Sequence, residues 1–440
     1  MLWSPLDEKF QQSATQGLAL DPPSYHANTI TAAYYHHSAA FPRELLQPLV
    51  YNALSRVIVQ IPSMVTILPH AVQIIQLRDG RDEEVDVLVE EQRNMRFPEL
   101  YEKVPCWRLV IAYTSGRSTV SDMVACFVVG EPASDQLCGM DFHRSFSAAL
   151  LLVNKAELSK QPSEYPSAKH SKRYSTSRQE KQTNHTQRHS QFKSVTLGTT
   201  DTARLLVDCF ANKTNITFAM QAVLAASLFS NLSSEFTTLR SAGRISPSGT
   251  IEHTIAIPCS EHITTHNRAQ GWHMTSIWNE AHRIHTAYNA EPSGKVRSNS
   301  LMGFLHRERG YTLCDTKDIS ETSGVSVGVS SMGSFQNSRS SQSEKQQEWQ
   351  TGRMMSSSDS NEINAALSVT LVVGGDGCLT IGFSWLDGDI EDFWLDKVVV
   401  NMRRLIGELL NTNGAAKTET VPWGGSVSRL VCMVRDLMLD

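Results

Sequence analysis

Residues Val128–His143 read VVGEPASDQLCGMDFH and join an apolar segment to an amphipathic one. Residues 124–129 are apolar and partly β-branched, which is typical of a strand, whereas residues 139–154 carry apolar side chains at helical spacing. A loop that leaves a buried strand and enters a helix is a common place for catalytic side chains, because the rigid elements present them to a cleft. The residues of this loop therefore bear on whether the chain is an enzyme.

The chain has 440 residues, more than one hydrophobic core usually serves, which predicts two subdomains. Hydrophobic residues make up 40% of it, and its formal net charge of -5 provides no overall attraction to nucleic acid or anionic membranes. The first residues lack a secretory signal pattern, and no run approaches the roughly 20 apolar residues of a membrane helix. We therefore expect a cytoplasmic protein that binds a small molecule and no nucleic acid.

Several common kinds of site are not indicated. Eight cysteines are spread along the chain without a CxxC pair, so neither a zinc site nor a disulfide framework is predicted. No GxSxG stretch joins a strand to a helix, which speaks against a Ser-His-Asp hydrolase. Residues Gly374–Gly377 lack the Lys-Ser or Lys-Thr of a phosphate-binding loop and are interpreted as a hairpin turn.

Two low-complexity regions divide the chain. Residues 155–195 are basic and rich in serine, and we interpret them as a flexible crossover linker, with RNA or anionic lipid binding as the alternative. The linker separates an N-terminal subdomain, residues 1–154, from a C-terminal subdomain, residues 196–440. Within the latter, residues 334–361 predict a long disordered surface loop.

Hydrophobic spacing predicts strands and helices in both halves. Strands are expected at residues 65–68, 107–113, 124–129, 253–257, 325–330, 367–373 and 379–385. Helices are expected at residues 44–58, 139–154, 217–232, 272–288 and 390–410. This mixture predicts an α+β protein with a cleft between its two halves.

Several segments follow the order of the elements of one known family. They are Ala32–Tyr35 with the helix that follows, WRLVI at residues 107–111, the run Gly139–Phe146, VSSMG at residues 329–333, and GGDGCLTIGFSWLDGDI at residues 374–390. Together they resemble the fungal alcohol acetyltransferase family, one of the chloramphenicol-acetyltransferase-like proteins that also include condensation domains. The resemblance implies a two-lobed α+β fold, with mixed sheets, flanking helices and a cleft between the lobes.

The resemblance also implies a reaction. The family's active-site motif is HHxxxDG, in which a histidine, a competent base near neutral pH, takes the proton of an alcohol as the alcohol attacks an acyl-CoA thioester. It implies acetyl-CoA or another acyl-CoA as co-substrate and a hydroxyl of a small fungal specialised metabolite as acceptor. A metal, a permanently bound cofactor and a second protomer are not implied.

This sequence departs from the motif at its histidines. Alignment from Gly139 places Gly130 and Glu131 on the two histidines and Asp135 on the aspartate. Glu131 is then the candidate base, because an apolar cleft can raise the pKa of a carboxyl group toward neutrality. Asp135 is the second candidate catalytic residue, with a structural role in the loop as its alternative.

The absent histidine leaves other interpretations open. Glu131 is a solvated loop residue if the chain is a catalytically degenerate or repurposed member that binds a metabolite or acts as an accessory protein. A third interpretation is an incorrect gene model around Glu131. The family pairs the motif aspartate with an arginine, and only His262 occurs at the corresponding place.

Four further residues are candidates for the walls of a substrate pocket: Trp107, Arg108, His143 and Trp385. Each also has a structural interpretation. Trp107 is then a buried anchor, Arg108 part of a scaffold ion pair, His143 a core or cap histidine, and Trp385 a core residue.

Overall fold

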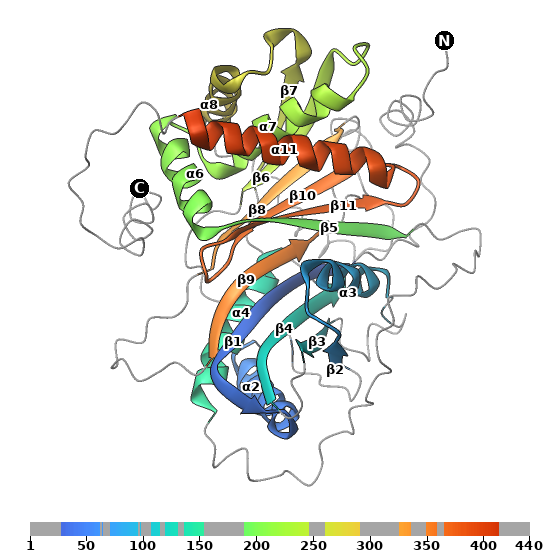
Figure 1. Ribbon diagram of the computed structural model, residues 1–440, viewed down its shortest axis with the longest axis vertical. Coiled ribbons are helices and arrows are strands. Elements are labelled where there is room, and N and C mark those ends of the chain that lie inside the picture. Colours follow the sequence, from blue (N-terminus) through green and yellow to red (C-terminus); the bar gives the residue numbers. More distant parts are fainter. Residues whose placement is uncertain are drawn as a thin grey trace, which may run out of the picture.

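The computed structural model describes residues 28–61, 64, 71–95, 97, 107–114, 119–130, 136–153, 189–245, 260–290, 325–335, 349–358 and 365–412. These residues form two mixed sheets, one above the other in Figure 1, with helices packed against them. The expected α+β class, with two mixed sheets and flanking helices, is confirmed.

The N-terminal sheet has the strand order β2-β3-β4-β1-β9. Its strands are β1 (Asn28–Pro42), β2 (Val72–Leu77), β3 (Trp107–Thr114), β4 (Thr119–Gly130) and β9 (Trp349–Ser357). β2 and β3 run parallel, and the other neighbours are antiparallel. β9 comes from the second half of the sequence, so both halves of the chain contribute to this sheet.

Strand β9 corrects the disordered loop expected at residues 334–361. Residues 349–357 pair with β1 as an edge strand, and residues 336–348 and 359–364 lie outside the described residues. The sequence WQTGRMMSS has no long apolar run, and its side chains are buried by contacts with distant segments that include β1, α4 and the second sheet. Strand β9 therefore belongs to the expected C-terminal subdomain by sequence but to the N-terminal sheet in space.

The C-terminal sheet has the order β5-β11-β10-β8-β6-β7. Its strands are β5 (Ser190–Leu197), β6 (Thr238–Ile245), β7 (Ser260–Asn267), β8 (Val327–Ser334), β10 (Leu367–Val373) and β11 (Leu379–Leu386). β5 begins inside the expected linker, of which residues 155–188 lie outside the described residues. The strands expected at 65–68 and 253–257 lie outside them too, whereas the other five expected strands are confirmed within a few residues.

Helices pack against both sheets. The first half has α2 (Leu46–Gln60), α3 (Asp82–Asn94) and α4 (Gln136–Leu152), and a short 3-10 helix, η1 (Arg43–Leu45), leads into α2. The second half has α6 (Thr199–Ala211), α7 (Ile216–Asn231), η3 (Arg268–Gln270), α8 (Met274–Ala290) and α11 (Asp392–Thr412). All five expected helices are confirmed, whereas α3 and α6 were not predicted.

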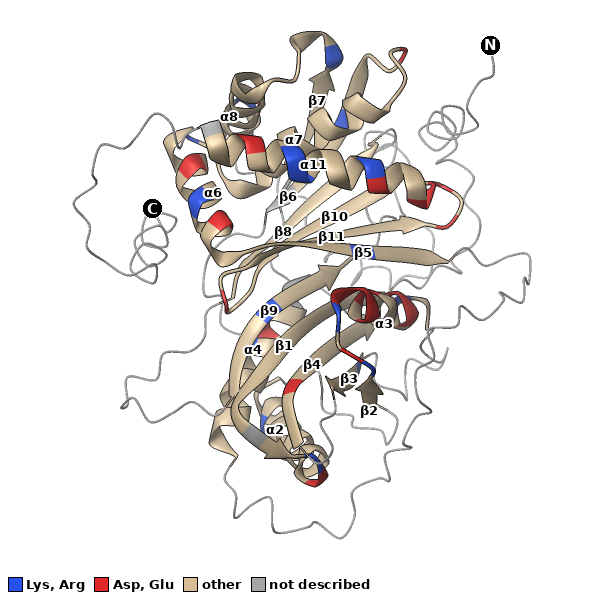
Figure 2. Cartoon of the chain, in the orientation of Figure 1, with Lys and Arg blue, Asp and Glu red and all other residues tan. Residues whose placement is uncertain are grey.

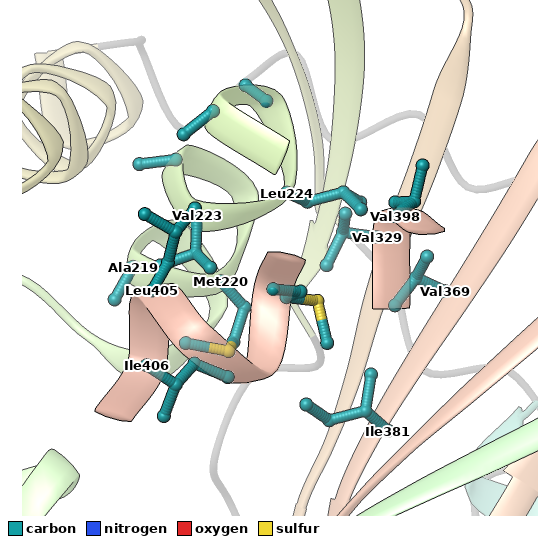
Figure 3. Packing of buried hydrophobic residues seen from close by; sticks show 14 of the residues in the cluster. Ala219, Met220, Val223, Leu224, Val329, Val369, Ile381, Val398, Leu405 and Ile406 are labelled. Atoms are coloured by element: carbon teal, nitrogen blue, oxygen red, sulfur yellow. The ribbon is translucent and has the colours of Figure 1, made fainter. Parts of the chain in front are cut away.

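The C-terminal core lies between α7, α11 and the sheet. Residues 216–229 of α7 are all buried, as expected for a helix that is apolar on every side. Figure 3 shows Met220 of α7 near Leu405 and Ile406 of α11, with Ile381 of the sheet beyond them. The side chain of Asn215 accepts a hydrogen bond from the Phe218 amide and so caps the start of α7.

Charged side chains are concentrated on helices and loops. Lys, Arg, Asp and Glu lie along the outer faces of α3, α6 and α11, whereas the strands are mostly uncharged (Figure 2). Among the residues that the structure describes, no helix is both long and apolar enough to cross a membrane.

Candidate active site

The candidate catalytic loop leaves the N-terminal sheet beside the C-terminal sheet. β4 ends at Gly130, which pairs with Asn28 at the start of β1, and α4 begins at Gln136. The strand and the helix expected on either side of the loop are therefore present. Glu131 and Asp135 themselves lie outside the described residues.

Hydroxyl side chains line the contact between the two sheets. Ser357 Oγ on β9 lies 3.0 Å from Ser384 Oγ on β11, and Thr370 Oγ1 on β10 donates to the Ser356 carbonyl oxygen at 2.5 Å. A Cβ atom at Gly382 would lie 2.5 Å from the same Ser356 oxygen, so the strands approach closely only because residue 382 has no side chain. We call this region, with the end of β4, the inter-sheet junction.

The C-terminal turn of α3 is bonded to both sheets at this junction. Asn94 Nδ2 donates to the Ser190 carbonyl oxygen and Asn94 Oδ1 accepts from the Ser190 amide, both at 2.8 Å. Arg93 Nη1 donates to Ser357 Oγ and to the Ser358 carbonyl oxygen, both at 2.5 Å. Two consecutive residues of one helix thus connect β5 of the C-terminal sheet with β9 of the N-terminal sheet.

Arg108 on β3 caps the end of α3. Its Nε donates to Gln92 Oε1 at 2.7 Å, and its Nη2 donates to the carbonyl oxygens of Gln92 and Met95 at 2.5 and 2.8 Å. Its guanidinium carbon lies 4.6 Å from the centroid of the Phe97 ring. The last carbonyl groups of a helix lack intrahelical partners and carry partial negative charge, so a guanidinium stabilises them. The geometry supports a structural role for Arg108 through these carbonyl groups.

Trp107 and Trp385 both lie in hydrophobic cores. Trp107 packs near Phe127, with 6.3 Å between ring centroids, in the N-terminal core. Trp385 belongs to the C-terminal core, whereas the preceding Ser384 contacts β9. Because successive side chains of a strand point to opposite faces, Trp385 faces the core when Ser384 faces the junction.

His143 on α4 is fully buried against β1, and both of its ring nitrogens are engaged. Its Nε2 lies 3.0 Å from the Thr31 carbonyl oxygen, and its Nδ1 lies 2.9 Å from the Tyr35 hydroxyl. A carbonyl oxygen only accepts, so Nε2 carries the proton and Nδ1 accepts from Tyr35. Burial lowers the pKa of His143 to about 4. The ring is therefore neutral near pH 7, and its lone pair is already used, which removes His143 as a replacement base.

His262 lies away from the junction. It is on β7, at the opposite edge of the C-terminal sheet from β5, and its ring centroid lies 6.2 Å from that of Tyr288 on α8. The contact with Tyr288 supports a packing role for His262 rather than a pairing with the catalytic loop.

A buried chain of polar groups in the second half was not anticipated from the sequence. His266 Nε2 lies 2.7 Å from Ser241 Oγ, and His266 Nδ1 lies 2.7 Å from Glu280 Oε1. Burial opposes ionisation of Glu280, but hydrogen bonds from Arg283, His266 and Gln270 outweigh it and lower its pKa to about 2.

This arrangement has the order of a Ser-His-Glu triad, but its surroundings are those of a structural network. Ser241, His266 and Glu280 are each at most 2% exposed, so a substrate carbonyl has no access to Ser241 unless the β6–β7 hairpin opens. The network instead ties that hairpin to α8. Among the described residues, no group of three or more His, Cys, Asp or Glu side chains could hold a metal ion.

No family model matches the chain. Its fold, however, is shared with solved structures of known proteins. Trichothecene 15-O-acetyltransferase TRI3 from Fusarium sporotrichioides superposes with a TM-score of 0.57 at 10% identity, over 91% of this chain and 92% of that one. The first condensation domain of the CDA synthetase superposes with a TM-score of 0.54 at 12% identity, over 93% and 95%. The fold is therefore that of the chloramphenicol-acetyltransferase-like and condensation-domain proteins.

One protein is similar to this chain in amino-acid sequence as well. The probable alcohol acetyltransferase crmB of Aspergillus fumigatus is 24% identical over 377 residues, which cover 76% of this chain and 79% of that protein. The resemblance to fungal alcohol acetyltransferases that the motifs indicated is confirmed by this match.

Proposed function

We propose that this protein is an acyl-CoA-dependent O-acyltransferase. It transfers an acetyl or other short acyl group from acyl-CoA to a hydroxyl of a small, specialised fungal metabolite. The observation that carries the proposal is the alignment with a probable alcohol acetyltransferase over most of both chains. Strand β4 and helix α4, which flank the candidate catalytic loop in the sequence, support it. The proposal includes a cytoplasmic, monomeric protein without a permanently bound cofactor.

In the proposed reaction, Glu131 acts as the general base. Its carboxylate takes the proton of the acceptor hydroxyl while the hydroxyl oxygen attacks the thioester carbonyl carbon. The tetrahedral intermediate then collapses, its carbon–sulfur bond breaks, and the coenzyme A thiolate leaves and takes the proton from Glu131. Asp135 holds the loop in shape. The products are an ester and free coenzyme A.

The end of β4, which Glu131 follows in the sequence, is apolar. Val128 and Val129 are buried, and the Phe97 ring lies against Gly130. Apolar surroundings disfavour the charged form of a carboxyl group and so bring its pKa closer to that of a useful base.

The second candidate function is a degenerate member that binds a metabolite or acts as an accessory protein. One observation favours it. Residues 131–135 contain no histidine, and the histidine that follows the loop on α4 has no free lone pair. If Glu131 does not act as base, the chain has the fold of an acyltransferase but does not catalyse acyl transfer.

Coenzyme A release from acetyl-CoA, measured with a mixed panel of hydroxylated metabolites, tests these proposals. Wild type is compared with Glu131→Ala, Glu131→His and the control Glu83→Ala, which removes an exposed carboxylate on α3. We expect wild type and Glu83→Ala to release coenzyme A equally. Glu131→Ala should be slower by about 10²-fold or more, the usual contribution of a general base.

Two other outcomes would contradict the proposal in different ways. A silent wild type with an active Glu131→His shows an intact cleft without its base and favours the degenerate function. Silence in every variant, together with no binding of acetyl-CoA by calorimetry, excludes an acyl-CoA-dependent enzyme.

A further inference from the structure

We propose that the contact between helix α3 and strand β5 is a proton-dependent clamp between the two sheets. The clamp consists of Asp86 and Asn94 on α3 and of Ser194 and Ser190 on β5. It is closed while Asp86 carries a proton, and α3 separates from β5 at Asp86 when that proton is lost. The inference does not depend on the proposed function.

The first step is the position of α3 between the sheets. Its apolar side packs in a hydrophobic cluster with strands of the N-terminal sheet. Its polar side faces β5, the edge strand of the C-terminal sheet, which lies beside it in Figure 1. Asp86 accepts hydrogen bonds from the Ser194 amide at 2.8 Å and from the Ser194 hydroxyl at 2.6 Å. A helix of one sheet is thus hydrogen-bonded to an edge strand of the other.

Strand β9 provides a second contact between the sheets, and this contact does not titrate. The Gly375 amide donates to the Gly352 carbonyl oxygen at 2.8 Å, and the Thr370 hydroxyl donates to that of Ser356. A Cβ atom at Gly374 would lie 2.7 Å from the Gly352 oxygen, so the strands approach backbone to backbone. β9 therefore holds the sheets together while the clamp opens.

The charges around Asp86 do not compensate a carboxylate. Asp82, one turn earlier on α3, is a second carboxylate, and Arg353 on β9 is the cation near both. The Arg353 guanidinium donates to both Asp82 oxygens, with 2.7 Å between Nη1 and Oδ2. Its fork is therefore engaged by Asp82. Among the residues that the structure describes, Asp86 is hydrogen-bonded to the neutral Ser194 and to no cation.

The neighbouring elements add no positive charge. Burial raises the pKa of Tyr34, on β1 beneath Arg353, to about 12, so this side chain is neutral near pH 7. Lys193, the charged residue of β5, is bonded to Asp396 on α11. Glu90, one turn after Asp86 on α3, adds negative charge. An ionised Asp86 is then a largely desolvated charge without a counter-ion, which is relieved when water reaches it.

The sign of the pH dependence follows from this placement. Burial, with a smaller contribution from the charge of Asp82, raises the pKa of Asp86 to about 6 in the closed clamp. In the open clamp water solvates the carboxyl group, and its pKa returns toward the ordinary value of about 4. The open fraction therefore rises with pH. Two pKa units correspond to about 10²-fold in the opening equilibrium, of which about tenfold falls between pH 5 and 7.5.

Hydrogen exchange of the full chain at pH 5 and pH 7.5 tests the inference, with each rate divided by the intrinsic rate at that pH. In wild type, peptides that cover residues 190–197 should exchange about tenfold faster at the higher pH. Peptides from residues 82–94 and 367–373 should keep their protection at both pH values. Their amides are bonded within helix α3 and within the centre of the C-terminal sheet, which do not open.

Two variants of the same helix separate the role of Asp86 from that of charge alone. Asp86→Asn still accepts from the Ser194 amide and donates to the Ser194 hydroxyl, so its exchange ratio should stay below about twofold. Asp82→Asn is the matched control, because it removes an equal charge one turn away and leaves Asp86 in place. Since burial is the main cause of the shift, we expect a rise of several-fold to remain in Asp82→Asn.

A wild-type ratio near one would overturn the inference, as would equal ratios in wild type and Asp86→Asn. Loss of the pH dependence in both variants would show an effect of helix charge rather than of Asp86, and would overturn it as well. Equal acceleration in residues 82–94 or 367–373 would mean unfolding instead of separation. The measurement needs neither acyl-CoA nor turnover, so a failure of the proposed function does not alter its outcome.

Discussion

Gly139, on the scale of single residues, sets how closely α4 lies on β1. A Cβ atom at this position would lie 2.0 Å from Thr31 Oγ1 and 2.5 Å from Thr31 Cβ. Glycine is unfavourable inside a helix, so the close approach to Thr31 explains its presence there. This contact therefore helps to fix the position of the first turns of α4 on β1.

The same substitution at two helical glycines should have opposite effects. We expect Gly139→Ala to lower the free energy of unfolding by about 1–3 kcal/mol, because the added methyl group overpacks the contact with Thr31. Gly407→Ala in α11 should raise it by about 1 kcal/mol, since no atom lies within 4 Å of the added Cβ and alanine is the better helix former. Urea denaturation measures both, and shifts of the same sign would contradict this account.

Helix α3, on the scale of elements, covers the edge strand β5. Asp86 accepts hydrogen bonds from the Ser194 amide at 2.8 Å and from the Ser194 hydroxyl at 2.6 Å, and Asn94 pairs with Ser190. The two helical positions lie about 12 Å apart and the two strand positions about 13 Å apart, from the rise per residue of each element. The match lets one helix bind the edge strand at two points and block its pairing with another chain.

Asp86 should make the stability of this contact depend on pH. Burial, with a smaller contribution from the charge of Asp82, raises the pKa of Asp86 to about 6, against the hydrogen bonds from Ser194 and the charge of Arg353. A carboxyl group with a raised pKa in the folded state contributes stability that is complete below about pH 4 and is lost as the pH rises through about 6. The wild-type free energy of unfolding should therefore fall from about pH 4.5 to 7.5 relative to that of Asp86→Asn.

Urea midpoints at several pH values test this prediction. The amide of Asp86→Asn can still accept from the Ser194 amide and donate to the Ser194 hydroxyl, so only the titration is removed. Asp86→Ala serves as the control that loses these hydrogen bonds at every pH. Parallel pH profiles for wild type and Asp86→Asn would show that Asp86 does not titrate in this range.

The two halves, on the scale of the whole molecule, share strand β9. It pairs with β1 and contacts the C-terminal sheet through Ser357 and Ser384. Met354 and Met355 on β9 are fully buried and belong to two different hydrophobic clusters of the N-terminal half. The N-terminal sheet therefore takes part of its core from the second half of the chain.

A chain of residues 1–188 alone should not fold cooperatively. It lacks β9, so β1 loses its partner strand and both clusters lose a buried methionine. We expect no cooperative urea transition and association of the exposed β1 edge during gel filtration, whereas the full chain unfolds in a cooperative transition. A monomeric fragment with its own cooperative transition would show that the first half is an independent domain.

The amino-acid sequence by itself determined the elements whose apolar side chains follow a regular period. Residues 367–373 have the composition of a buried strand, and residues 216–231 have that of a buried helix. The apolar run before Gly130 and the helical spacing after Gly139 likewise predicted β4 and α4. The ordered motifs also pointed to the class of fold. These features are local, because a period or a motif depends on neighbours in the chain.

Other elements and side-chain contacts were determined only by the tertiary structure. Strands β5 and β9 mix polar with apolar residues, and their buried Phe192, Met354 and Met355 join hydrophobic clusters formed with distant segments of the chain. No regular apolar period therefore predicts these strands. Helix α3 has only a narrow apolar stripe, Val85, Leu88 and Val89, among many acidic residues. His143 meets Tyr35, and Arg108 meets the end of α3, across long separations in sequence. Such side chains acquire their roles from hydrogen-bond partners that only the folded chain brings together.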